Sequence, residues 1–157
     1  MKHIDTVRFC KDNTRLEGSF TASDLPRLAL EVLQGTALKV DWIAQGERPD
    51  SLNLALKASV QMTCQRCLNA IDESIDVQYD FQFVKDEATA QAQDEMSDDV
   101  VMLVHDREFD VQALIEDEML MALPFVSLHD VCPSAGAIAH LPKEDKPNPF
   151  AILKSMA

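Results

Sequence analysis

Several features that mark membrane, secreted or phosphate-binding proteins are absent from this sequence. No run approaches the roughly 18 apolar residues that cross a bilayer, and residues 1–6 lack the apolar segment of a secretory signal. We therefore expect a cytoplasmic protein. Glycine is scarce, with four residues in 157, and no Gly-rich phosphate loop or nucleophile elbow occurs.

Groups suited to acid–base catalysis are also few and dispersed. His3 lies at the N-terminus and His140 in a linker, while His105 lies in an acidic loop, residues 105–108, where we expect a solvated ion pair. The consecutive acids 116–118 fall on a predicted helix, so their side chains point in different directions and are expected mostly at the surface. With no convergent acid–base set, the sequence predicts a protein that is not an enzyme.

Positive charge is nearly missing from the middle of the chain. Residues 72–118 hold sixteen Asp and Glu but two Lys and Arg, so this acidic block carries a net charge of −14 in a chain of net charge −13. Such a surface repels phosphate and disfavours non-specific binding to nucleic acid. A basic protein partner is the better electrostatic match, and Glu116, Asp117 and Glu118 are predicted to contribute to that contact.

Four cysteines in a reducing compartment are poor disulfide candidates. Cys64 and Cys67 have the Cys-x-x-Cys separation at which two thiolates bind one metal ion, and Cys132 with His129 could complete a Cys3His zinc site. The alternatives are that these cysteines are small buried hydrophobic residues, or that the site is vestigial or partly occupied. Thioredoxin-like redox chemistry is disfavoured because a strand, not a helix, follows the motif. Cys10 lies far from the others in the sequence and is expected to take no part in the site.

Alternating polar and apolar residues predict an antiparallel sheet. Two long alternating stretches flank the Cys-x-x-Cys motif, which places it at the turn of a hairpin. In a zinc knuckle such a turn directs backbone N–H groups at the thiolates. The predicted strands are residues 14–20, 37–45, 51–63, 70–84 and 100–104.

Two main helices are predicted to pack on this sheet. Residues 23–34 show helical apolar spacing, with Ser23 as the expected N-cap and Pro26 in the first turn. In residues 110–123 apolar side chains recur at spacings of three and four residues, as on one face of a helix, and Asp110 is the expected N-cap. The fold class is therefore α+β, with the antiparallel sheet either open or curled towards a barrel.

The length and the hydrophobic content of 46% fit one globular domain. We expect residues 1–133 to form a single α+β domain. Residues 85–99 lack an apolar period and are expected to be an exposed acidic loop. Residues 134–157 are predicted to be a linker followed by an apolar C-terminal motif, whose residues Asn148, Pro149 and Phe150 could contact a partner.

Three stretches together resemble the bacterial YceD family of large ribosomal RNA subunit accumulation proteins, which is also found in chloroplasts. They are residues 63–67, residues 115–124 leading to His129 and Cys132, and residues 147–153. Their order and spacing cover most of the chain. The resemblance implies a role in the synthesis, processing or stability of the 23S large-subunit ribosomal RNA, without known catalytic activity.

The resemblance also bears on the metal ligands, because the family is described as metal-binding and nucleic-acid-binding on account of its cysteines. Cys64, Cys67 and Cys132 match those positions, whereas the loop containing His129 is shorter than in some relatives. The leading hypothesis is an assembly factor that binds a ribosomal protein or a large-subunit intermediate. The alternative is a zinc-knuckle module in which Arg66 contacts ribosomal RNA directly.

Overall fold

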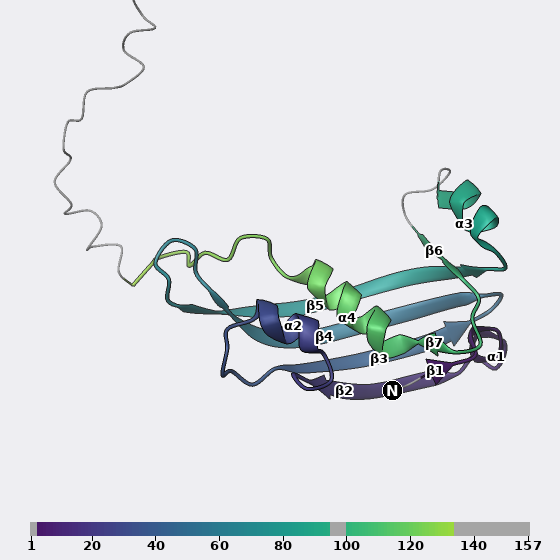
Figure 1. Ribbon diagram of the computed structural model, residues 1–157, viewed down its shortest axis with the longest axis horizontal. Helices are drawn as coiled ribbons and strands as arrows, with labels where there is room; N and C mark the ends of the chain where they lie inside the picture. The colour runs from purple at the N-terminus through teal and green to yellow at the C-terminus, as the bar shows by residue number, and fades with distance from the viewer. Residues whose placement is uncertain (1–2, 95–99, 134–157) are drawn as a thin grey trace, which may run out of the picture.

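The computed structural model describes residues 3–94 and 100–133, arranged as Figure 1 shows. Two short strands pair with each other, and five strands form the main sheet. The strands are β1 (His3–Ile4), β2 (Arg15–Thr21), β3 (Lys39–Glu47), β4 (Ser51–Thr63), β5 (Ala70–Val84), β6 (Val101–Val104) and β7 (Phe109–Asp110). The helices are α1 (Thr6–Lys11), α2 (Pro26–Glu31), α3 (Glu87–Asp94) and α4 (Val111–Ala122). The predicted α+β class is confirmed.

The main sheet has the strand order β2-β3-β4-β5-β6. Its centre is the hairpin of β4 and β5, whose register is continuous from Ser51 opposite Gln82 to Thr63 opposite Ala70. The fully antiparallel arrangement predicted from the sequence is wrong at one edge, because β6 runs parallel to β5. The barrel-like alternative is not supported, since β6 pairs with only four residues and the described strands β2 and β6 remain separate edges of an open sheet.

The hydrophobic core lies on one face of this sheet, here called the inner face. Alternation along the strands places Trp42, Leu54 and Phe81 on it, and all three are buried together with Ile115 and Met119 of α4. Helices α2 and α4 lie across this face in Figure 1. Among the described helices, none is long and apolar enough to cross a membrane.

Helix α2 spans six residues, whereas the sequence predicts a helix over 23–34. Its first turn is not capped by Ser23, whose hydroxyl lies beside that of Thr21 instead. Its last turn ends early because the chain becomes extended and the N–H of Leu33 donates to the carbonyl of Gln61 on β4 (2.7 Å). A backbone hydrogen bond to the sheet therefore takes the place of a further helical turn.

A carboxylate from a distant helix caps α2. One oxygen of Glu116 accepts the backbone N–H groups of Arg27 (2.7 Å) and Leu28 (3.3 Å), and the other accepts Nε–H of Arg27 (2.9 Å). Glu116 is only 7% exposed, which corrects the expectation that it is a surface group. Negative charge at a helix N-terminus satisfies N–H groups that have no partner within the helix. Glu116 thus joins α4 to α2.

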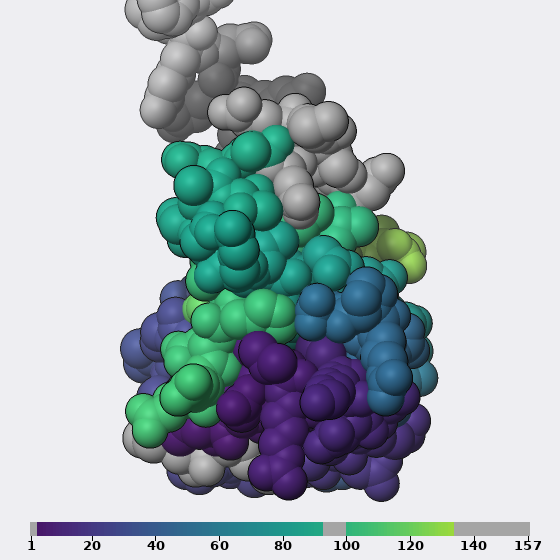
Figure 2. All heavy atoms as spheres, turned by 90° about the vertical axis from the view of Figure 1, so that its right-hand side faces the viewer, coloured from purple at the N-terminus to yellow at the C-terminus, as the bar shows by residue number. Residues whose placement is uncertain are grey.

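The end of the sheet away from the hairpin turn is closed by N-terminal residues. Figure 2 faces this end and shows them, in purple, between the green residues that follow position 100 and the blue β3–β4 turn. The ring of His105 stacks on Phe83, while its Nδ1 lies 2.9 Å from Oγ1 of Thr6 and its Nε2 lies 3.5 Å from Asp50. The predicted solvated pair at His105 is therefore wrong, because its side chain is 18% exposed and held from several sides.

Part of the predicted acidic loop 85–99 is helical. Helix α3 begins after Asp86, whose carboxylate accepts the N–H of Thr89 (2.9 Å), and Ala90 is buried. Alanine and glutamine favour helix even without a strong apolar period, and Asp86 supplies the capping acceptor. Residues 95–99 lie outside the described residues.

Candidate metal centre

Cys64 and Cys67 lie in the turn that joins β4 to β5. The N–H of Cys64 donates to the carbonyl of Asn69 (2.9 Å), and the N–H of Leu68 donates to the carbonyl of Cys64 (2.8 Å). Leu68 has a φ of 61°, the left-handed conformation that lets the chain reverse within a few residues. The predicted position of the motif at a hairpin turn is confirmed.

The other two candidate ligands come from the segment that follows α4. This segment returns to the hairpin, where the carbonyl of Ser127 accepts the N–H of Gln65 (3.0 Å). His129 and Cys132 follow within five residues of that attachment. The β4–β5 turn and the chain after α4, distant in sequence, therefore meet at one place.

The donor atoms of Cys64, Cys67, His129 and Cys132 all lie within 4.8 Å of one another. The sulfur atoms of Cys64 and Cys132 are 3.8 Å apart, and the Cys67 sulfur is 3.4 Å from Nδ1 of His129. Two thiolates bound to zinc at about 2.3 Å in a tetrahedron are separated by about 3.8 Å. The cluster can therefore hold a tetrahedral ion such as zinc.

The imidazole of His129 is oriented for this role. Its Nε2 lies 3.1 Å from the carbonyl oxygen of Ala70, a contact that requires a proton on Nε2. The neutral ring then has its lone pair on Nδ1, the atom that faces the sulfur of Cys67. A second hydrogen bond that fixes the tautomer in this way is usual for metal-binding histidines.

The electrostatics of the cluster favour a thiolate. Burial alone would raise the pKa of Cys64, but the backbone N–H groups of His129, Cys67 and Arg66 outweigh it and lower the pKa to about 5. Burial keeps the pKa of Cys132 above its ordinary value, although Nε of Arg66 donates to the Cys132 sulfur at 2.9 Å. The same guanidinium donates to the carbonyl of His129 (2.5 Å). Arg66 therefore supplies positive charge beside the cluster.

Cys10 takes no part in this centre. It lies at the opposite end of the sheet, where its buried thiol faces the carbonyl of Ser51 (3.4 Å). Burial, followed by the charge of Asp50, raises its pKa to about 11. A neutral buried thiol of this kind behaves as a small hydrophobic residue.

Comparison with known proteins identifies the family to which the chain belongs. The family model described as "Large ribosomal RNA subunit accumulation protein YceD" matches residues 52–157, more than half of the chain. The chain belongs to the YceD family. A curated YceD relative from Haemophilus influenzae (strain ATCC 51907 / DSM 11121 / KW20 / Rd), bearing the same description, is 24% identical over 169 residues, which cover 98% of this chain and 93% of the relative. No solved structure matches.

The YceD match includes all four cluster residues, and the structure brings together the whole predicted ligand set. The residues predicted to bind a partner are dispersed. Glu116 caps α2, Asp117 pairs with Arg27 (2.7 Å) at the surface, and Glu118 is half-buried near Tyr79. Asn148, Pro149 and Phe150 lie outside the described residues, so their role stays a prediction.

The sequence does not reveal the groups that support the ligands. The carbonyl of Ala70 orients His129, and the carbonyl of Ser127 attaches the returning segment to the hairpin. Because every residue has a backbone carbonyl, no residue type in the sequence marks these two positions. Arg66 is the exception among these supporting groups, because its position between Cys64 and Cys67 already places it beside the predicted ligands in the sequence. The sequence suggests Arg66 as an RNA contact, whereas the structure shows its donors directed at Cys132 and His129.

Proposed function

We propose that this chain supports accumulation of 23S ribosomal RNA without catalysis, by binding a basic protein of the assembling large subunit. The family name supplies the process, since YceD proteins are named for accumulation of large-subunit RNA. We infer the mode of binding from the acidic block at residues 72–118, because a surface of this charge is complementary to a basic surface.

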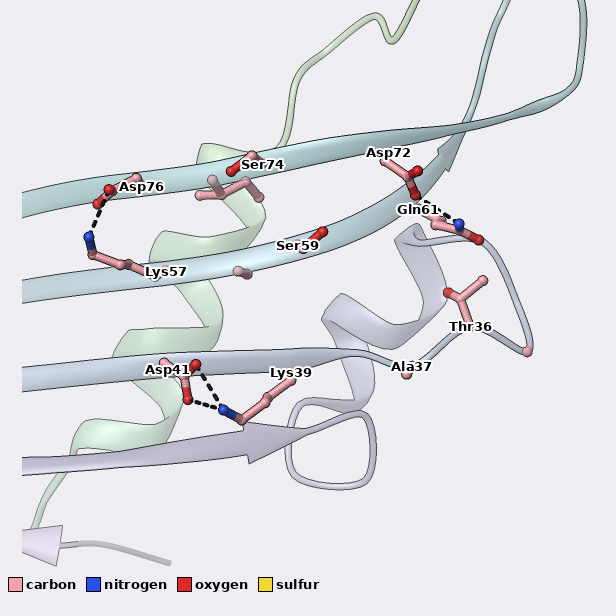
Figure 3. Close-up of a pocket in the computed structure, with 13 residues that line it drawn as sticks. Thr36, Ala37, Lys39, Asp41, Lys57, Ser59, Gln61, Asp72, Ser74 and Asp76 are labelled. Atoms are coloured by element: carbon pink, nitrogen blue, oxygen red, sulfur yellow. Dashed lines mark hydrogen bonds and ion pairs between the residues drawn. The ribbon is translucent and has the colours of Figure 1, made fainter.

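The arrangement of charges on the outer face of the sheet supports a protein partner over naked RNA. Figure 3 shows this face, with Lys39 paired to Asp41 (2.7 Å) and Lys57 paired to Asp76 (2.9 Å). The carboxylate of Asp72 on β5 accepts a hydrogen bond from the uncharged side-chain amide of Gln61 (2.8 Å). Lys39 and Lys57 already face carboxylates, so they are poorly placed to hold phosphate groups.

The metal centre has a structural role in this proposal. Cys64, Cys67, His129 and Cys132 would bind one zinc ion, which would cross-link the hairpin turn to the segment after α4. Four protein ligands are typical of structural zinc, because catalytic zinc keeps a position open for water or substrate. This arrangement supports a binding protein rather than a metalloenzyme.

The proposal is tested by affinity capture from cell extract with the full-length chain, tagged at its N-terminus, in parallel with an unrelated protein of equal net charge. We expect the chain to recover large-subunit proteins at low ionic strength and to lose them as salt rises, because exposed charges are screened. Recovery of no large-subunit component at low salt, or equal recovery by the control, would contradict the proposal.

Direct contact with ribosomal RNA is a second candidate because Arg66 is exposed at the hairpin turn. It predicts that Arg66→Glu and Cys64→Ser each abolish a gel shift of large-subunit RNA fragments at low ionic strength. The contacts of Arg66 with Cys132 and His129 leave fewer donors for phosphate. Absence of any shift with the unaltered chain excludes this candidate and leaves the protein-binding proposal intact.

A further inference from the structure

One side of β5 is paired over only part of its length. β4 pairs with β5 along its other side from Ala70 to Gln82, whereas β6 pairs with residues 81–84 alone. Figure 1 shows β5 along the margin of the sheet, with β6 beside one end. Among the described residues, no strand pairs with this side of β5 from Asp72 to Asp80. An unpaired edge presents backbone groups that can accept another strand.

The hydrogen bonds to β4 show which residues of β5 present those groups. The N–H of Phe83 donates to the carbonyl of Asp50, and at the other end of the hairpin the carbonyl of Asn69 accepts from Cys64. Bonded residues alternate along an antiparallel pair. With a continuous register, the odd-numbered residues of β5 are therefore bonded to β4.

The even-numbered residues point their N–H and C=O groups the other way. At one end the carbonyl of Val84 accepts the N–H of His105, and at the other the carbonyl of Ala70 accepts Nε2–H of His129. Both partners lie on the side of β5 opposite β4. Between these two points, Gln82 lies where β6 pairs, and the remaining outward backbone groups belong to Asp72, Ser74, Asp76, Gln78 and Asp80.

The side chains along this edge differ between its two faces. The even-numbered residues are exposed on the outer face and include Asp72, Asp76 and Asp80, four residues apart. Asp76 pairs with a lysine, whereas Asp72 and Asp80 accept hydrogen bonds from the uncharged side-chain amides of Gln61 and Asn53. On the inner face, Val77 and Tyr79 are half-buried against the core. An added strand would meet acids on the outer face, and on the inner face it would meet Val77 and Tyr79, with Glu73 nearer the hairpin turn.

We propose that the edge of β5 from Asp72 to Asp80 binds an extended basic segment of a partner protein, which adds to the sheet as a further strand. The inference rests on the proposed function, and it specifies the surface and the conformation of the partner. The segment carries basic residues at every fourth position, opposite the three aspartates. Its alternate residues are apolar and face Val77 and Tyr79.

Other pairings at the sheet edges fit less well. Two β5 edges from two copies of this chain would place aspartates against aspartates, and like charges directly opposite each other destabilise a strand pair. The edge formed by β2 offers no net charge, because its Arg15 and Glu17 pair with each other (3.1 Å). The acidic complement to a basic strand is therefore at β5.

The probe is the synthetic peptide Lys-Val-Thr-Val-Lys-Val-Thr-Val-Lys with blocked ends, added to the isotopically labelled full-length chain with zinc. We expect the amide NMR signals of Asp72, Ser74, Asp76, Gln78 and Asp80 to shift and their hydrogen exchange to slow. The same peptide with N-methylated backbone amides is the control and should not bind. No change at these amides, or equal binding of the methylated peptide, overturns the proposal.

Gln78→Pro separates backbone pairing from side-chain contact. Proline removes the outward N–H of Gln78 but leaves the bonds to β4, which use odd-numbered residues, and Gln78→Thr keeps that N–H. We expect Gln78→Pro to weaken binding of the peptide about tenfold or more, and Gln78→Thr to change it by less than about twofold. Equal binding by the two variants overturns the proposal.

Charge variants give a second measurement should Gln78→Pro fold poorly. Asp72→Asn and Asp80→Asn together should weaken binding of the peptide about threefold to tenfold at low salt, while Asp41→Asn, on the same face but on β3, should leave it nearly unchanged. If all of these variants bind the peptide alike, the edge is not the site.

Capture from extract distinguishes the two proposals. If the unaltered chain recovers large-subunit proteins and Gln78→Pro recovers them equally well, the proposed function stands and the β5 edge is excluded. If the unaltered chain recovers none, the proposed function itself fails. A dimer in sedimentation that Gln78→Pro dissociates would assign the edge to a second copy of the chain and overturn the inference.

Discussion

Replacing Glu116 by alanine should destabilise the protein more than any other single change among its acids. The buried carboxylate accepts the backbone N–H groups of Arg27 and Leu28, and Glu116→Ala leaves both donors at the start of α2 without a partner. Loss of a helix cap costs about 1 kcal/mol, and loss of a charged acceptor for buried donors costs about 1.5–3 kcal/mol. We therefore expect the free energy of unfolding to fall by about 3 kcal/mol.

Urea unfolding at constant zinc concentration measures this change. Asp117→Ala is the matched control, because Asp117 also pairs with Arg27 but is exposed, and its loss should change the free energy by less than about 0.5 kcal/mol. Glu116→Gln keeps an oxygen that can accept the backbone N–H groups and should lose about half as much as alanine. If Glu116→Ala is no more destabilising than Asp117→Ala, the carboxylate does not join α4 to α2 as we infer.

Three further predictions concern the metal centre and the core. Elemental analysis of the untagged protein should give about one zinc per chain, and Cys64→Ser should remove it and lower the unfolding midpoint; an unchanged midpoint would make the centre dispensable for folding. Arg66→Gln should weaken zinc affinity about tenfold in a chelator competition because it removes a donor from the Cys132 sulfur, whereas Gln65→Ala should not. Gly46→Ala should lower the free energy of unfolding by about 2 kcal/mol, since its Cβ would lie 2.5 Å from the carbonyl oxygen of Phe9; a change below about 0.5 kcal/mol would show that α1 can move.

Local patterns in the sequence were sufficient for most of the sheet and for the ligand set. Strict alternation gave the bounds of β4 and β5 as residues 51–63 and 70–84, because a strand buried on one face must repeat every two residues. The Cys-x-x-Cys motif fell at their turn for the same reason. Residue chemistry then singled out His129 and Cys132 as partners for Cys64 and Cys67, and the structure places all four together.

The predictions that failed depend on contacts between distant segments. From local sequence Glu116 is expected at the surface, but it is buried because α2 lies beside α4. His105 is likewise expected to be solvated, but Thr6 and Phe83 contact its ring. Helix α2 ends where pairing with β4 competes with it. Each outcome involves partners far apart in the chain, which no local period encodes.

The sequence by itself determined the class of fold, the central hairpin, the candidate metal ligands and the acidic block. These follow from residue type and spacing, which act over a few neighbouring positions. The tertiary structure decided the direction of β6 and the short length of its pairing, and with them the edge of β5 that no strand among the described residues pairs with. Strand pairing depends on how far each strand extends beside the next, and that is fixed only when the whole sheet has assembled.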